Sequence, residues 1–217
     1  MAEYRCENCG APIERRIRTS RLVACTACNT TQMLVDDVFR NAGTQGVMLE
    51  VPGLLTLGRR ARLPGFEVEV LGHLRFSYGP GWWDEYWCDA GDKQLWISVD
   101  EGDIAIERPM QPGDIPRSIV PGPGAQFKLR RVTYTATEVE TAECIALRGE
   151  LPEVIAIGER HAYVDFTGDR GEIVTYERWE CAAGVEEAWY TGTWIDPWEV
   201  EPLDDDTPRR FAMPEVP

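Results

Sequence analysis

Histidine and long apolar runs are nearly absent from this sequence, and each shortage excludes a class of function. Only two histidines occur in 217 residues, and neither His73 nor His161 lies in a recognisable catalytic motif. The sequence also contains no phosphate-binding loop, dinucleotide fingerprint or nucleophile elbow, so we expect a protein that is not an enzyme. The best apolar stretch, Val47 to Leu57, is interrupted by Glu, Pro and Gly and is too short to cross a bilayer.

Basic residues are also scarce. Lys and Arg total 22 against 37 Asp and Glu, which gives a formal net charge of −15. Such a surface repels phosphate backbones and anionic membranes, so it disfavours nucleic acid as a partner and leaves only indirect contact with a membrane. The N-terminus has no apolar signal segment. Since four of the seven cysteines stand at metal-ligand spacing, they fit a reducing compartment, and we expect a cytoplasmic protein.

Composition divides the chain into four parts. Residues 1–35 carry the paired cysteines, and residues 36–50 have the composition of a linker. Residues 51–200 contain short runs with an apolar residue at every second position, separated by turns rich in Gly, Pro and Asp. Residues 201–217 are acidic and interrupted by proline, which predicts a disordered tail.

The middle segment predicts a mainly β fold. Strands that recur about every 8–12 residues with turn signals between them indicate an antiparallel β-sandwich or a small barrel. The turn sequence Pro121–Gly124 divides the segment into two parts of similar size, which leaves an internal duplication open. Typical alternating runs are Phe66, Val68 and Val70, then Leu95, Ile97 and Val99.

The clearest motif is a set of two short cysteine pairs near the N-terminus. A gap of two residues lets both thiolates of a pair reach one ion, and Zn²⁺ prefers four such ligands at tetrahedral corners. The spacing resembles the zinc-ribbon family and predicts a structural zinc site, because four sulfur ligands leave no open position for a substrate. The predicted ligands are Cys6, Cys9, Cys25 and Cys28.

The residues around the cysteines support this reading. Gly10 and Asn29 each follow one pair, and both residue types tolerate the left-handed backbone that such turns need. Five arginines in residues 1–30 could contact phosphate, or they could simply offset the negative charge of a zinc–thiolate cluster. We favour the second interpretation, and a nucleic-acid-binding ribbon stays open as the alternative.

The densest aromatic cluster follows the turn Gly79–Gly81. On a strand after this turn, Trp83, Glu85 and Trp87 share one face. Aromatic rings and carboxylates together can hold a cationic group, whereas ordinary core packing explains the same aromatics without a ligand. The candidate residues for binding a ligand or partner are therefore Trp83, Glu85, Trp87 and Trp96.

The run Phe-Ser-Tyr-Gly-Pro-Gly-Trp-Trp-Asp-Glu-Tyr-Trp at residues 76–87, followed by Leu-Trp-Ile-Ser at 95–98 and Asp-Glu-Gly at 100–102, resembles the bacterial domain-of-unknown-function family 4178. The resemblance covers about residues 50–200. Members of that family are often preceded by a zinc ribbon and tend to be encoded near membrane-stress, band-7-like and polyamine-synthesis-like proteins. The resemblance implies an accessory role and supplies no catalytic residue.

These features predict a non-enzymatic zinc-binding adaptor that docks an unidentified protein partner, in a bacterial membrane-stress-associated system. Two alternatives stay open. One is a nucleic-acid-binding protein that uses the ribbon arginines. The other is a β domain that binds a small cationic ligand, or acts as an enzyme, through the Trp-rich strand.

Overall fold

The computed structural model describes residues 4–35, 38–48, 52–181 and 184–204. In this part of the chain nearly all regular structure is β strand, with one 3-10 turn, η1 (Pro197–Glu199). No helix among the described residues is long and apolar enough to cross a membrane.

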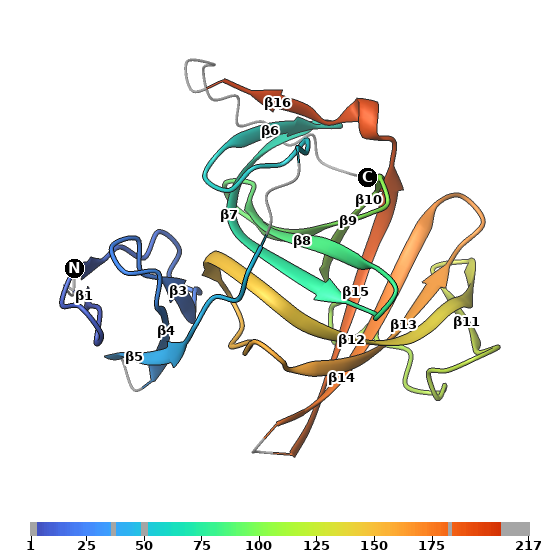
Figure 1. Ribbon diagram of the computed structural model, residues 1–217. Helices are drawn as coiled ribbons and strands as arrows, with labels where there is room; N and C mark the ends of the chain where they lie inside the picture. The colour runs from blue at the N-terminus through green and yellow to red at the C-terminus, as the bar shows by residue number, and fades with distance from the viewer. Residues whose placement is uncertain (1–3, 36–37, 49–51, 182–183, 205–217) are drawn as a thin grey trace.

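Eight antiparallel strands close a barrel (Figure 1). They run in the order β7-β8-β9-β10-β15-β14-β13-β12, and β12 pairs back onto β7. The barrel confirms one of the two β architectures that the sequence predicts. The strands are β7 (Phe66–Ser77), β8 (Trp82–Asp89), β9 (Gln94–Asp100), β10 (Asp103–Pro109), β12 (Val132–Leu151), β13 (Arg160–Thr167), β14 (Glu172–Cys181) and β15 (Gly184–Ile195).

The connectivity of the barrel repeats once along the chain. Each half begins with a short strand that forms a hairpin with the first long strand: β6 (Arg60–Leu63) with β7, and β11 (Gln126–Leu129) with β12. Each half then continues as a four-stranded meander. The halves join where equivalent strands pair, β7 with β12 and β10 with β15. The turn sequence Pro121–Gly124 lies between them, at the division that the sequence indicates.

Both faces of the barrel wall are covered. The outer face of the first half packs under β6 and Val200, and Ile97 is fully buried there. The outer face of the second half packs under the β11 hairpin and the segment before it, with Phe166 fully buried. A third apolar cluster, which includes Leu74, Trp87 and Trp96, fills part of the interior. Since the strands alternate, the residues next to Ile97 face the barrel interior.

Glycines stand at both joins between the halves. A Cβ on Gly192 would lie 2.0 Å from the backbone oxygen of Ile106, across the β10–β15 pairing. At the other join a Cβ on Gly149 would lie 2.2 Å from the backbone oxygen of Leu71, and Gly149 has a φ of +75°. Because glycine has no Cβ, the paired strands can approach each other closely at these two points. This close approach lets the sheet close into a barrel.

The N-terminal sheet packs at one end of the barrel (Figure 1). It contains β3 (Leu22–Ala24), β4 (Thr31–Val35) and β5 (Val38–Gly43), and a separate two-stranded sheet beside it contains β1 (Tyr4–Arg5) and β2 (Pro12–Ile13). Strand β3 pairs with the end of β12, so the β3–β5 sheet is hydrogen-bonded to the barrel. Strand β5 lies inside the stretch 36–50 expected as a linker, and the ribbon sheet therefore continues to Gly43.

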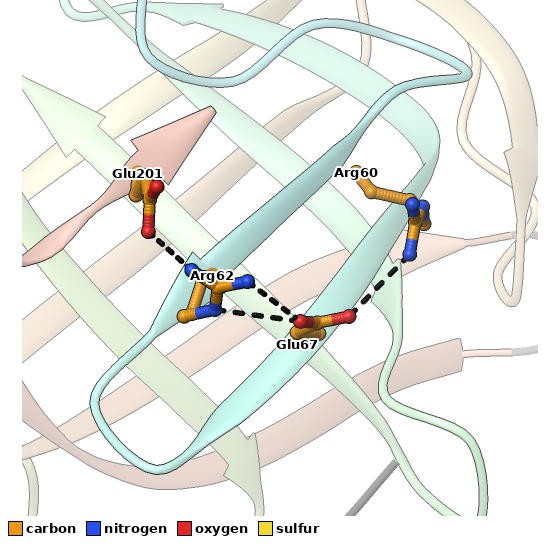
Figure 2. A network of polar contacts seen from close by, with 4 residues as sticks. All are labelled: Arg60, Arg62, Glu67 and Glu201. Carbon is orange, nitrogen blue, oxygen red and sulfur yellow. Dashed lines mark hydrogen bonds and ion pairs between the residues drawn. The ribbon is translucent and has the colours of Figure 1, made fainter. Parts of the chain in front are cut away.

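Part of the expected tail forms a strand that pairs with β6, next to the barrel. Residues 201–203 form β16 (Glu201–Leu203), which pairs with β6, while residues 205–217 lie outside the described residues. Figure 2 shows the ionic network that accompanies this pairing. Arg62 donates to Glu201 at 2.6 Å and to Glu67 at 3.2 Å, and Arg60 donates to the other oxygen of Glu67 at 3.4 Å. The network ties β16 to the β6–β7 hairpin.

Candidate metal centre and barrel cavity

The four N-terminal cysteines form one cluster. Their sulfur atoms all lie within 4.8 Å of one another, and the Sγ–Sγ distance is 3.7 Å for both Cys6–Cys28 and Cys9–Cys25. A Zn–S bond of about 2.3 Å places tetrahedral sulfurs about 3.8 Å apart. The cluster therefore has the dimensions required to hold a metal ion.

Two equivalent turns build this cluster. The amide of Gly10 donates to Cys6 O at 2.8 Å, and the amide of Asn29 donates to Cys25 O at 2.8 Å. Gly10 and Asn29 have φ values of 73° and 57°, as the sequence indicates for the residue after each pair. Hydrogen bonds from Thr30 and Asn8 lower the pKa of Cys28 to about 6, whereas the neighbouring thiols raise the pKa of Cys9, so the first thiolate of the cluster forms at Cys28.

The barrel interior holds two adjacent cavities. The larger, here called the ribbon-side cavity, has a volume of about 340 Å³ and includes Arg21 of the ribbon in its lining. The smaller, here called the inner cavity, has a volume of about 120 Å³. The two share Glu85, Ser98, Glu107, His161 and Glu177 as lining residues.

The charge in these cavities is strongly one-sided. Among the described residues that line them, Arg21 is the only arginine or lysine, against nine acidic residues. Burial raises the pKa of Glu85 to about 8 and that of Asp165 to about 7. The interior is therefore a concentrated acidic site. The nine are Glu85, Asp100, Glu107, Glu138, Glu153, Glu159, Asp165, Glu177 and Glu186.

Glu107 is a buried acid that both cavities share, and one of its oxygens has no partner. It is 7% exposed, and its Oε1 atom has no hydrogen-bond partner. The Ser98 hydroxyl donates to its other oxygen at 3.4 Å, and Thr175 also hydrogen-bonds to this carboxyl. Leaving a carboxyl oxygen unsatisfied in a protein interior costs free energy, so Glu107 presents an unmet demand for a donor or a cation inside the barrel.

Aromatic rings stand beside the acids. Trp83 Nε1 donates to Glu85 at 2.9 Å, and the Trp83 and Tyr163 rings meet edge to face with centroids 5.3 Å apart. Tyr190 and Trp96 line the ribbon-side cavity. Electron-rich ring faces next to carboxylates are suited to hold a cation.

All four candidate residues from the aromatic block lie inside the barrel, in two environments. Glu85 and Trp96 line the ribbon-side cavity, and Trp83 and Glu85 line the inner cavity. Trp87 lines neither of the described cavities and packs on Trp96, with ring centroids 5.0 Å apart. The block therefore supplies both core packing and cavity wall.

Three central acids have no distinguishing motif in the sequence: Glu107, Asp165 and Glu177. Each occupies a polar position in the alternation of polar and apolar residues along its strand, and an acid at such a position ordinarily faces solvent. The available signal was the alternation Thr175, Glu177, Trp179 on β14, which places an acid on the same face as an aromatic residue. Without knowledge that the sheet closes, this pattern does not identify an interior.

Comparison with known proteins gives one match. The family model described as "Domain of unknown function (DUF4178)" matches residues 56–197, which spans the barrel from just before β6 to the end of β15. Neither the curated proteins nor the solved structures contain a match to this chain.

Proposed function

The chain belongs to the family described as a domain of unknown function (DUF4178), and we propose that its barrel binds a small organic cation. We further propose that zinc occupies the cysteine cluster and has a structural role. The observation that carries the binding proposal is the unpartnered, buried carboxyl oxygen of Glu107 among the acids of the cavities.

The distribution of the acids favours an organic cation over a metal ion. Among the described residues, only the four cysteines bring three or more metal-ligating atoms close together. The cavity acids come from different strands, including β8, β10, β13 and β14. A metal ion needs several oxygens at about 2.0–2.6 Å from one point, whereas an ammonium or amidinium group accepts separated carboxylates and aromatic faces.

The cavities favour ligand binding over the roles that need an exposed surface. Docking of a protein partner stays a prediction from the sequence, and so do the absence of catalysis and the cytoplasmic location. Nucleic acid remains disfavoured by the net charge of −15.

Isothermal titration of the full, metal-loaded chain tests the binding proposal. The ligands are alkylammonium and guanidinium ions of increasing size, with alcohols and carboxylates of matched length as controls. We expect saturable binding of cations only, and about tenfold weaker binding for Glu107→Gln, because one charge-assisted contact is lost. Asp92→Asn removes one exposed charge in the β8–β9 turn, outside both cavities, and is expected to bind like the parent. Equal binding of alcohols and cations would rule the proposal out.

Cation binding is expected to depend on pH. The raised pKa values of Glu85, about 8, and Asp165, about 7, mean that both carboxyls carry protons at pH 6 and lose them between pH 7 and 8. A bound cation favours the ionised form, so binding should release protons and strengthen as the pH rises from 6 to 8. Titration in two buffers of different ionisation enthalpy measures the protons released. Weaker binding at pH 8 than at pH 6 would contradict the assignment of these acids to the site.

The zinc proposal predicts one metal ion per chain. Elemental analysis of purified protein should find zinc at a molar ratio of about one. Cys25→Ser should lose the metal, because the serine hydroxyl is a poor ligand for a tetrahedral sulfur site. Cys88→Ser alters a buried cysteine of the barrel wall and should retain the metal. Full metal content in Cys25→Ser would contradict the assignment of this ligand.

A further inference from the structure

Residues 21–25 connect the metal cluster to the ribbon-side cavity within a few residues. Arg21 lines the cavity. Leu22 is fully buried in the interior cluster of the barrel, and Val23 is buried in the small core of the ribbon. Cys25 belongs to the metal cluster. Neighbouring side chains of one strand point in opposite directions, so β3 is anchored in both cores at once.

Glu150 fixes this segment against the barrel. Its carboxylate accepts hydrogen bonds from the Arg16 amide at 2.7 Å and from the Ser20 hydroxyl at 2.7 Å. The Ile17 amide donates to the same carboxylate at 3.3 Å, and the Arg21 amide donates to Leu151 O at 2.9 Å. The ribbon therefore lies against the barrel in a defined position.

The ribbon core is too small to hold that position without the metal. Its described buried apolar residues are Cys6, Ile13, Val23, Cys25 and Phe39, and two of these are metal ligands. Segments of this size usually depend on a metal or disulfide to fold. Loss of the metal is thus expected to release the segment that carries Arg21.

We propose that metal binding at the cysteine cluster holds Arg21 at the entrance of the ribbon-side cavity and thereby restricts access to the acidic interior. This inference rests on the proposed function, since it concerns entry to the same cation site. Arg21 acts as a positioned gate residue.

Charge supports the role of Arg21. Glu153 lies in the lining of the same cavity and accepts a hydrogen bond from the Tyr190 hydroxyl at 3.1 Å. Burial raises the pKa of Glu153, and the positive charge of Arg21 counteracts that rise. A guanidinium near this carboxyl repels an arriving cation, so removal of the side chain is expected to open the entrance both sterically and electrostatically.

Carboxyl labelling with a water-soluble carbodiimide and glycine ethyl ester tests access directly. The modification rates of Glu85 and Glu177 are measured by peptide mass spectrometry in the metal-loaded full chain, in the chain stripped by a chelator, and in metal-loaded Arg21→Ala. We expect both rates to rise about tenfold in the stripped chain and in Arg21→Ala, as for local opening of an ordered segment. Arg18→Ala alters an exposed arginine of the same segment that is outside the cavity lining and should match the parent.

Hydrogen exchange separates local opening from general unfolding. In the stripped chain, amides of residues 4–43 described in the structure should lose protection while those of β8 and β9 keep it. Unchanged labelling despite loss of ribbon protection would overturn the inference, and so would a ribbon that stays protected without metal. If the modification rates of Glu85 and Glu177 rise in the stripped chain but not in metal-loaded Arg21→Ala, the role of Arg21 is overturned. Since labelling uses no organic cation, these results do not depend on whether the proposed ligand binds.

Discussion

Gly192→Ala is expected to destabilise the barrel by about 3 kcal/mol, at the upper end of what overpacking normally costs. The added Cβ would lie 2.0 Å from the backbone oxygen of Ile106 and 2.9 Å from a side-chain atom of Glu107. Backbone in the β10–β15 pairing cannot move aside without breaking ladder hydrogen bonds. Thermal and urea unfolding of the metal-loaded chain measure the loss, with a midpoint lower by roughly 10 °C.

A matched alanine variant gives the control for this experiment. Gly113 has no atom within 4 Å of a built Cβ and lacks a left-handed φ, so Gly113→Ala should change the unfolding free energy by less than about 0.5 kcal/mol. Gly149→Ala tests the other join and should behave like Gly192→Ala, with an added cost from its positive φ. Unfolding of Gly192→Ala at the parent temperature would mean that the two halves do not need this close approach.

The double substitution Glu85→Gln with Glu177→Gln is expected to weaken binding of an organic cation by about a hundredfold. Each glutamine keeps an acceptor oxygen, including the one that receives the Trp83 indole hydrogen at 2.9 Å. Each loses the charge, and a hydrogen bond to a charged group contributes about 1.5–3 kcal/mol. Titration calorimetry at pH 8 measures the change, with Asp92→Asn as the matched variant outside the cavities.

The same double variant is expected to be more stable than the parent at pH 8. Burial raises the pKa of Glu85 to about 8 and raises that of Glu177, where repulsion by Glu85 adds to the effect. Groups with a raised folded-state pKa stabilise the fold below their unfolded pKa, and this contribution is lost as the pH rises through the folded-state pKa, which is about 8 for Glu85. Each such carboxyl makes the unfolding free energy fall by about 1.4 kcal/mol per pH unit between these limits.

Urea unfolding at pH 6 and pH 8 under saturating metal tests this dependence. The parent should lose stability towards pH 8, and the double variant should lose less. Lower stability of the variant at pH 8 would show that the ionised acids hold the barrel together. The role of these acids would then be structural, and destabilisation of the barrel would explain the loss of cation binding without a direct contact to the cation.

The metal cluster was accessible to prediction because its information is local. Two residues between the cysteines of each pair, with Gly10 and Asn29 after them, specify two turns whatever surrounds them. The structure brings the four sulfurs within 4.8 Å of one another. The attachment of the ribbon to the barrel was not predictable in this way. Glu150 accepts hydrogen bonds from amides that lie more than a hundred residues away in the sequence.

The β class was also predictable, and so was the division near Pro121–Gly124. Alternation at period two and regular turns depend on neighbouring residues alone. Closure was not, since it depends on pairings between distant strands, β7 with β12 and β10 with β15. The glycines that permit these pairings resemble ordinary turn or strand glycines in the sequence.

The sequence by itself determined where the strands run and which cysteines come together in one cluster. Only the tertiary structure decided which face of each strand is the interior. Ile97 marks an apolar face that packs outward under β6, whereas Glu107 and Glu177 stand on faces that line the cavities. The physical reason is that alternation distinguishes two faces without assigning either to the inside. The β6 strand and the β11 hairpin cover the apolar face on the outside of the barrel, and closure of the barrel encloses the acidic face.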